Sequence, residues 1–146
     1  SYKVNTEDFM STDITVLPRD AGFEDVLKVI TASDDYEYPV VENAESGILV
    51  GTVGRSQLVH FLETHESQGP PDSGDKKALS AGTLSDTCSI EPVTFQLSTW
   101  TSLHQAHHLF ELLNLQQAFV TKFGRIVGRV TRKEMRKTIE DLANSK

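Results

Sequence analysis

Three histidines stand close together in the second half of the chain, at a spacing that would bring imidazoles onto one helix face. They are His104, His107 and His108, at relative positions i, i+3 and i+4. Two imidazoles on one face can bind zinc, but a zinc site needs a third and usually a fourth ligand. No cysteine or further histidine has an obvious claim to complete the set, so the sequence favours ordinary helix histidines and predicts no metal site. Because imidazoles titrate near physiological pH, a pH-sensing role stays open.

The other reactive residue types do not form an arrangement typical of catalysis. Cys88, the only cysteine, has neither a glycine elbow nor an evident base beside it in the sequence. The serines and threonines stand mostly where caps and turns are expected, and no glycine-rich phosphate loop is present. Trp100 directly precedes a predicted helix, and we expect it to pack at the helix N-terminus and not to bind a ligand. We therefore predict that the chain is not an enzyme.

The charge distribution excludes one class of partner. The formal net charge is −7 at pH 7, whereas nucleic-acid binders have a broad basic surface, so no nucleic acid is predicted. Acidic residues gather between positions 34 and 45, and basic residues gather between positions 122 and 137. This distribution is typical of two solvated faces. The alternative is that the basic end faces an anionic lipid surface or a partner.

These residues are carried by a pattern of elements that occurs twice, about eighty residues apart, which is a strong constraint on the fold. Each copy predicts an amphipathic helix, a hairpin of two short apolar strands with a glycine in the second, and a closing helix. A short extended stretch precedes each first helix. The first copy places these elements at 23–30, 38–41, 48–53 and from Ser56 onward. The second places them at 103–110, 118–121, 125–130 and from Lys133 onward.

The repeat divides the chain of 146 residues into three parts. Residues 1–63 form the first repeat with an N-terminal segment, 64–86 form a linker, and 87–146 form the second repeat. The linker is rich in Gly, Pro and polar residues, so we expect it to be mobile and to be cleaved first by proteases. Each half alone would leave one sheet face uncovered, so we expect the halves to pack sheet to sheet with pseudo-twofold symmetry. No apolar run approaches the roughly 20 residues that span a bilayer, and the chain is expected to be soluble by itself.

The order strand-helix-strand-strand-helix, with YPVV at 38–41 and GRVTRKE at 128–134, resembles a tandem of CBS domains. The stretches EPVTFQL at 91–97, TSLH at 101–104 and LFELL at 109–113 resemble the cytoplasmic C-terminal part of CLC chloride channels and transporters. ESGILVG at 45–51 and FELLNL at 110–115 are most similar to the kidney-type CLC-K branch. The fold class that this resemblance implies is α/β (α+β), with two CBS repeats packed as a pseudo-twofold pair.

The resemblance implies a cytoplasmic regulatory domain of a membrane chloride channel, which would modulate gating, dimer assembly or trafficking without catalysis. It implies a homodimer, a membrane-embedded channel domain in the same polypeptide, and a small accessory membrane subunit as a further partner. It also implies a location at the cytoplasmic face of a membrane, which is the plasma membrane for the full-length protein. We expect the isolated chain to be folded and to dimerise weakly through an apolar surface.

The alternative keeps the fold and changes the function to an adenine-nucleotide-sensing CBS pair that regulates a transporter or a soluble enzyme. Nucleotide-binding relatives use a closing Asp to accept the ribose hydroxyls, and the matching candidates here are Tyr36, Thr131 and Glu134. The set is degenerate, since Glu134 replaces the Asp, and Gly54 and Gln57 stand at the matching positions of the first repeat. The carboxylates on both sides of Tyr36 would repel a polyphosphate. Residual attraction for phosphate would come from Lys122, Arg125 and Arg132. We therefore expect ATP or AMP to bind poorly or not at all, and we predict no cofactor.

Overall fold

The computed structural model describes residues 4–66, 82–93 and 95–145. It consists of two compact units, each containing one of the two predicted repeats. The repeat-1 unit is Thr15–Val93. The repeat-2 unit combines Ser1–Ile14 with Thr94–Lys146. We describe each unit by itself.

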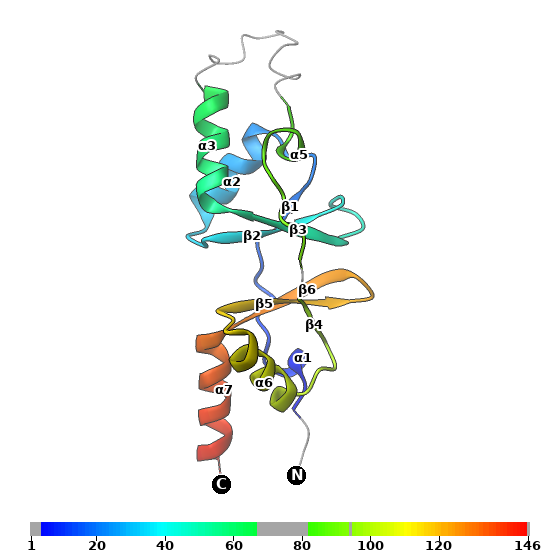
Figure 1. Cartoon of the computed structure of the whole chain (residues 1–146), viewed down its shortest axis with the longest axis vertical. Coiled ribbons are helices and arrows are strands. Elements are labelled where there is room, and N and C mark those ends of the chain that lie inside the picture. Colours follow the sequence, from blue (N-terminus) through cyan, green and yellow to red (C-terminus); the bar gives the residue numbers. More distant parts are fainter. Residues whose placement is uncertain (1–3, 67–81, 94, 146) are drawn as a thin grey trace. The chain divides into compact units, whose positions relative to one another are not determined.

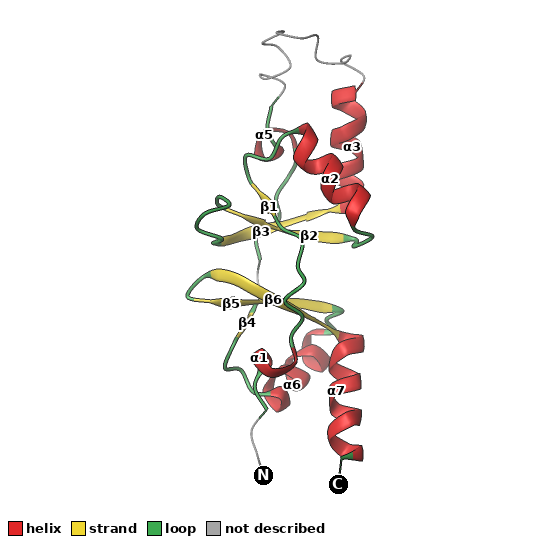
Figure 2. Ribbon diagram, turned by 180° about the vertical axis from the view of Figure 1, so that it is seen from behind, coloured by secondary structure: helices red, strands yellow, loops and turns green. Residues whose placement is uncertain are grey.

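The repeat-1 unit is a three-stranded sheet covered on one face by helices. Its elements in chain order are β1 (Leu17–Pro18), α2 (Phe23–Ala32), β2 (Glu37–Val41), β3 (Leu49–Gly54), α3 (Arg55–Glu66) and α5 (Leu84–Thr87). The strand order is β1-β2-β3, with β1 parallel to β2 and β2 antiparallel to β3. Both ribbon views place α2 and α3 over the same face of this sheet (Figures 1 and 2).

The repeat-2 unit has the same plan. Its elements in chain order are α1 (Thr6–Phe9), β4 (Leu97–Ser98), α6 (Leu103–Leu113), β5 (Gln117–Lys122), β6 (Arg125–Thr131) and α7 (Arg132–Asn144). The strand order is β4-β5-β6, again with one parallel and one antiparallel pairing, and α6 and α7 share one face of the sheet (Figure 2). The predicted fold class and the predicted order of elements within each repeat are therefore confirmed.

Periodicity in the sequence accounts for both cores. In the repeat-1 unit, Val26 and Val29 lie one turn apart on α2 and pack with Tyr38 and Val40, which alternate along β2. The matching core of the repeat-2 unit is built from Ala106, Phe110, Ala118, Val120 and Met135. Every one of these side chains is buried, so each helix presents its apolar stripe to one pleated face.

Each hairpin has an irregularity at the same place, and a glycine stands beside it. The strand register shifts after Val40 in one unit and after Val120 in the other. The neighbouring glycines have no room for a side chain. A Cβ added to Gly51 would lie 2.5 Å from the Glu91 carbonyl oxygen, and one added to Gly128 would lie 2.7 Å from the Met10 sulfur. In both units the close neighbour is a separate stretch of chain that crosses the hairpin.

The boundaries of the two units differ from the predicted domain boundaries, because the crossing stretches belong to other units than the sequence suggested. The sequence-based division assigned the N-terminal segment to the first repeat, but Thr6 N–H donates to Thr101 O (2.8 Å) and Ser11 exchanges two backbone hydrogen bonds with Arg129. Residues 87–93, assigned to the second repeat, lie in the repeat-1 unit, where Glu91 exchanges two backbone bonds with Thr52. The flanking segments thus pack against the other copy, which similarity between the copies does not reveal.

Most of the predicted linker lies outside the described residues. Its first residues, 64–66, complete α3, and its last residues contribute to α5 (Leu84–Thr87). This short helix is tied to the repeat-1 unit, because Leu84 N–H donates to Ala21 O at 2.9 Å. The protease sensitivity that we expect for the linker stays a prediction.

Candidate functional site

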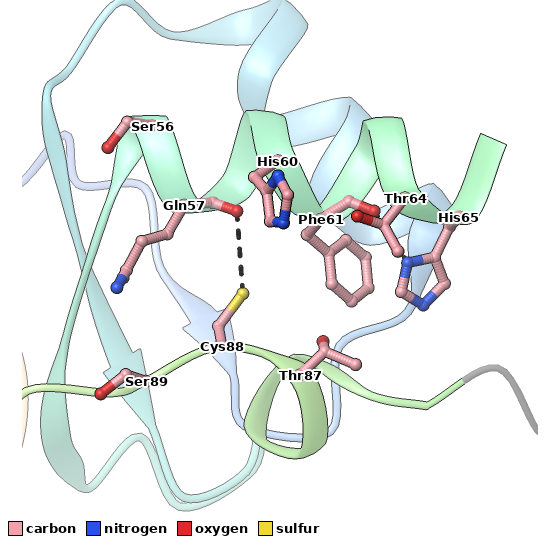
Figure 3. Close-up of a pocket in the computed structure, with 9 residues that line it drawn as sticks. All are labelled: Ser56, Gln57, His60, Phe61, Thr64, His65, Thr87, Cys88 and Ser89. Carbon is pink, nitrogen blue, oxygen red and sulfur yellow. Dashed lines mark hydrogen bonds between the residues drawn. The ribbon is translucent and has the colours of Figure 1, made fainter. Parts of the chain in front are cut away.

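The repeat-1 unit contains an open groove of about 460 Å³ between α3 and the chain that passes through α5 (Figure 3). It is lined by Ser56, Gln57, His60, Phe61, Thr64, His65, Thr87, Cys88 and Ser89. The rings of Phe61 and His65 stack with centroids 4.0 Å apart, and His65 Nδ1–H donates to Phe61 O at 2.7 Å. One turn of helix therefore fixes both rings at the groove wall.

Cys88 points across this groove toward α3, where its thiol donates to Gln57 O at 3.8 Å (Figure 3). Burial raises the pKa of the Cys88 thiol above its ordinary value of 9.0, and a side-chain hydrogen bond with Thr87 offsets part of that effect. A raised pKa keeps the thiol protonated at neutral pH, whereas the thiolate is the nucleophile. What the groove offers is therefore a binding surface of aromatic and hydrogen-bonding groups and not an activated thiol.

The repeat-2 unit has a groove at the matching position, with different chemistry. Its volume is also about 460 Å³, and its lining residues are Val4, Asp8, Phe9, Glu134, Lys137, Thr138, Asp141 and Leu142. Lys137 occupies the place of His60 and forms an ion pair with Asp141 at 3.3 Å. The two grooves are thus the same feature of the fold, one lined by aromatic and imidazole rings and the other by paired charges.

Two of the three predicted nucleotide-site residues, Thr131 and Glu134, contact each other at the start of α7, and Glu134 also lines this second groove. Glu134 Oε1 accepts hydrogen bonds from both the backbone N–H and the hydroxyl of Thr131, each at 3.0 Å, and Glu134 N–H donates to the Thr131 hydroxyl. This reciprocal pattern is a capping box at the start of α7. The third residue, Tyr36, is an exposed residue of the repeat-1 unit.

The first repeat forms a reduced version of the same cap. Gly54 N–H donates to Gln57 Oε1 at 3.4 Å, and no hydroxyl is available at Gly54. In both repeats, therefore, the two residues bond to each other at the first turn of the closing helix. Both pairs, which the sequence analysis considered only as nucleotide-site positions, share a role in helix capping.

The three histidines of α6 do not converge on a metal. His107 Nε2 lies 3.4 Å from one carboxylate oxygen of Glu111, and the other carboxylate oxygen accepts from Arg132 at 3.3 Å. That bond from Arg132, aided by nearby positive charge, holds the pKa of Glu111 below its ordinary value of 4.5. Across the described ranges, no group of three or more His, Cys, Asp or Glu side chains is placed to hold a metal ion.

Two arginines at the start of the closing helices have a role that the sequence analysis missed. Arg55 donates to Ser33 O (2.6 Å) and Ile30 O (3.1 Å). Arg132 donates to Leu115 O (2.9 Å) and Phe110 O (3.0 Å). Both guanidinium groups thereby satisfy carbonyl oxygens at the end of the preceding helix, where the helix dipole is negative. Arg132, which we had considered as an attractor of phosphate, is instead bonded to these carbonyl oxygens. Its position directly before the predicted closing helix was the sequence feature that could have indicated this role.

Trp100 does not pack at the N-terminus of α6 as expected. Its side chain is 58% exposed, and its ring lies 6.0 Å from that of Phe123, which is 83% exposed. Phe123 sits in the turn between β5 and β6. The contact joins two turns that are distant in sequence, so no local sequence pattern predicts it.

The chain is similar to known proteins in both sequence and fold. The family model for the CBS domain matches residues 7–64. The chloride channel protein ClC-Kb of Xenopus laevis is 76% identical over 146 residues, which are 100% of this chain and 21% of the relative. Human ClC-Kb is 48% identical over 144 residues, 99% of this chain and 20% of that protein. The chain thus spans about a fifth of the length of these curated relatives. In the part of the chain that the structure describes, no helix has both the length and the apolar character needed to cross a bilayer.

The fold has solved counterparts. The CBS-pair protein CBSX2 from Arabidopsis thaliana, crystallised in complex with AMP, matches with a TM-score of 0.65 at 19% identity, covering 97% of this chain and 99% of that one. At this identity, the likeness concerns the fold.

Proposed function

Because the chain belongs to the CBS domain family and corresponds to the CBS region of ClC-K chloride channels, we propose that it is the regulatory region of a membrane chloride channel. In this proposal it acts on gating, dimer assembly or trafficking and carries out no catalysis. The observation that carries the proposal is the 76% identity that extends over the whole chain. The region lies at the cytoplasmic face of the plasma membrane, joined to a membrane-embedded channel domain of the same polypeptide, with a small accessory membrane subunit as a further partner.

The test uses the full-length channel that carries this chain. Gly128→Val should disrupt the repeat-2 unit, because the new side chain would meet Met10 and Ser11. Gly22→Ala is the matched control, since nothing lies within 4 Å of a Cβ at that position. We expect the Gly128 variant, and not the control, to lower the chloride current.

Surface biotinylation and single-channel recording then separate the possible causes. A fall in surface abundance alone assigns the region to trafficking or assembly, and a fall in open probability assigns it to gating. An unchanged current in a Gly128 variant whose CBS region is unfolded would overturn the regulatory proposal.

A homodimer is the second element of the proposal. Leu112 and Leu113 at the C-terminal end of α6 are 67% and 47% exposed, and adjacent exposed leucines on a helix favour contact with another apolar surface. A second copy of the chain is the proposed occupant. Weak association of the isolated chain would suffice, because an attached membrane part holds the subunits at high effective concentration.

Sedimentation equilibrium at tens of micromolar tests this contact. We expect a monomer–dimer equilibrium that Leu112→Lys with Leu113→Lys abolishes and that Glu140→Lys, on exposed α7 surface, leaves intact. A purely monomeric parent chain would count against the homodimer, and a dimer that survives the leucine changes would place its interface elsewhere.

The nucleotide-sensing alternative has one specific observation in its favour, namely that the fold is shared with a protein crystallised with AMP. We propose that the present chain binds ATP and AMP weakly or not at all. The Glu134 carboxylate already accepts two hydrogen bonds from Thr131, so ribose hydroxyls would compete with the α7 cap. Titration calorimetry measures the affinity directly. A low-micromolar dissociation constant that Glu134→Ala abolishes and Glu140→Ala preserves would replace our proposal with the alternative.

A further inference from the structure

The repeat-2 unit carries an exposed pair of aromatic side chains that serves neither core. Trp100, in the turn between β4 and α6, is 58% exposed, and Phe123, in the β5–β6 turn, is 83% exposed. Their rings are tilted by 57° with centroids 6.0 Å apart, a geometry in which aromatic pairs attract. The pair thus forms one continuous apolar surface from two turns.

The turn itself does not call for phenylalanine. Phe123 and Gly124 have φ values of 52° and 84°, and they connect Lys122 and Arg125, which are register partners in the hairpin. Two-residue turns with positive φ at both positions favour Asn, Asp or Gly, because a bulky side chain is strained in the left-handed region. A strained residue that is also solvent-exposed points to a role outside the fold.

Positive charge flanks the pair. Lys122 and Arg125 are exposed, and neither forms an ion pair with another described residue. One acidic residue is bonded beside this surface, since the backbone N–H of Glu7 donates to Thr99 O at 3.0 Å. We call Trp100, Lys122, Phe123 and Arg125 the aromatic tip.

The matching surface of the repeat-1 unit has the opposite character. Asp20 stands at the position of Trp100, and Glu42 stands at the position of Lys122, where it forms an ion pair with Arg19 at 3.1 Å. A longer polar turn containing Glu45 replaces Phe123. One fold therefore presents an acidic surface in one copy and an aromatic, basic surface in the other, so the aromatic tip is not a requirement of the fold.

We propose that the aromatic tip binds the headgroup region of an anionic lipid bilayer. Tryptophan and phenylalanine beside lysine and arginine are the combination that favours this interface, because the rings enter the headgroup layer while the cations meet lipid phosphates. The chain's net charge of −7 opposes approach only weakly, because charges more than about 10 Å from the contact are largely screened at physiological salt.

The inference rests on the proposed function in one respect, namely that an attached channel domain would hold the tip near a bilayer. Its test requires the isolated chain alone. A negative result would therefore remove the lipid contact and leave the regulatory proposal standing.

The experiment uses the chain's single tryptophan as its own reporter. Vesicles of phosphatidylcholine with about one third phosphatidylserine are titrated into the chain, with vesicles of phosphatidylcholine alone in parallel. We expect the Trp100 emission to shift to shorter wavelength and to be quenched by brominated lipids, with anionic vesicles only. Lys122→Gln with Arg125→Gln should weaken partitioning about 30-fold, from roughly 1 kcal/mol for each basic residue near an anionic surface.

A matched pair on α7, Lys133→Gln with Arg136→Gln, removes the same charge at exposed positions away from the tip. It should change partitioning less than threefold, and Phe123→Ser should weaken it while leaving the fold intact by circular dichroism. An unshifted Trp100 emission, or equal losses in both glutamine pairs, would overturn the proposal. Tip-dependent self-association without vesicles would overturn it too, in favour of a second copy of the chain as the partner.

Discussion

In the repeat-1 unit, Arg55 donates to the carbonyl oxygens of Ile30 and Ser33, and in the repeat-2 unit Arg132 does the same for Phe110 and Leu115. The glycine beside the hairpin bulge and the short helix that packs near the closing helix also occur in both units. These shared features all satisfy backbone groups or allow close backbone contact. They recur because the same chain path leaves the same hydrogen bonds to be made.

The solvent-facing features differ between the units. The groove beside the closing helix holds His60, His65 and Phe61 in one unit and an ion pair of Lys137 with Asp141 in the other. The aromatic tip has an acidic counterpart around Glu42. The features that build the fold are therefore the same in both units, whereas the exposed side chains of the two units differ.

The glycines test the first half of this comparison and carry the largest expected effect. Gly128→Val and Gly51→Val should each destabilise the chain by about 3 kcal/mol or more, because an added Cβ would lie within 2.8 Å of neighbouring atoms. Gly51 should be the more sensitive, since its nearest atom is the backbone oxygen of Glu91, while that of Gly128 is the flexible Met10 side chain. Urea unfolding measures both against Gly22→Ala, for which we expect a change within about 0.5 kcal/mol.

The arginines carry the next largest effect. Arg55→Met and Arg132→Met should each cost about 2 kcal/mol, because charged hydrogen bonds to helix-terminal carbonyls are lost. Arg55 should cost more, since it also donates to the hydroxyl of buried Tyr38 at 2.9 Å. Thermal unfolding provides the measurement, with Arg136→Met on exposed α7 surface as the control. If the control loses as much stability as either variant, the shared role of the arginines is wrong.

The helix caps should respond in opposite directions. Thr131→Ala should destabilise the repeat-2 unit by about 1 kcal/mol through loss of the capping hydroxyl. Gly54→Thr should stabilise the repeat-1 unit by roughly 0.5 kcal/mol, because a hydroxyl would complete the cap and no atom lies closer than 3.9 Å to the new Cβ. Chemical denaturation of both variants would detect this; a loss of stability in the Gly54 variant would show that the two caps are not equivalent.

The smallest expected effect concerns pH and Glu111. The hydrogen bond from Arg132 holds the pKa of Glu111 below 4.5, so the ionised carboxylate stabilises the fold at higher pH. This contribution should be fully present above the unfolded-state pKa and should fade as the pH falls through the folded-state pKa. The stability difference between the parent chain and Glu111→Gln should therefore shrink below about pH 4.5. Unfolding curves of both proteins between about pH 3 and 7 would reveal it, and a stability difference that stays constant over this range would contradict it.

Much of each repeat was predictable because its signals are local. The short apolar run YPVV at 38–41 indicated β2, the amphipathic pattern of residues 23–30 indicated α2, and the recurrence of this order indicated two CBS repeats. Thr131 and Glu134 were singled out through the family resemblance, as candidate nucleotide-site residues, and the structure shows that they form a capping box. For these features, the sequence alone determined the element type and its approximate position.

The tertiary structure decided which distant segments meet. The N-terminal segment hydrogen-bonds to the second repeat through Thr101 and Arg129, and Trp100 pairs with Phe123. Arg132 reaches the end of the preceding helix through the folded chain. None of these contacts has a periodic signature, since each joins residues whose separation is set by loops and strands between them. Residue spacing therefore determined the types and the order of the helices and strands. Only the long-range packing determined which distant residues come into contact.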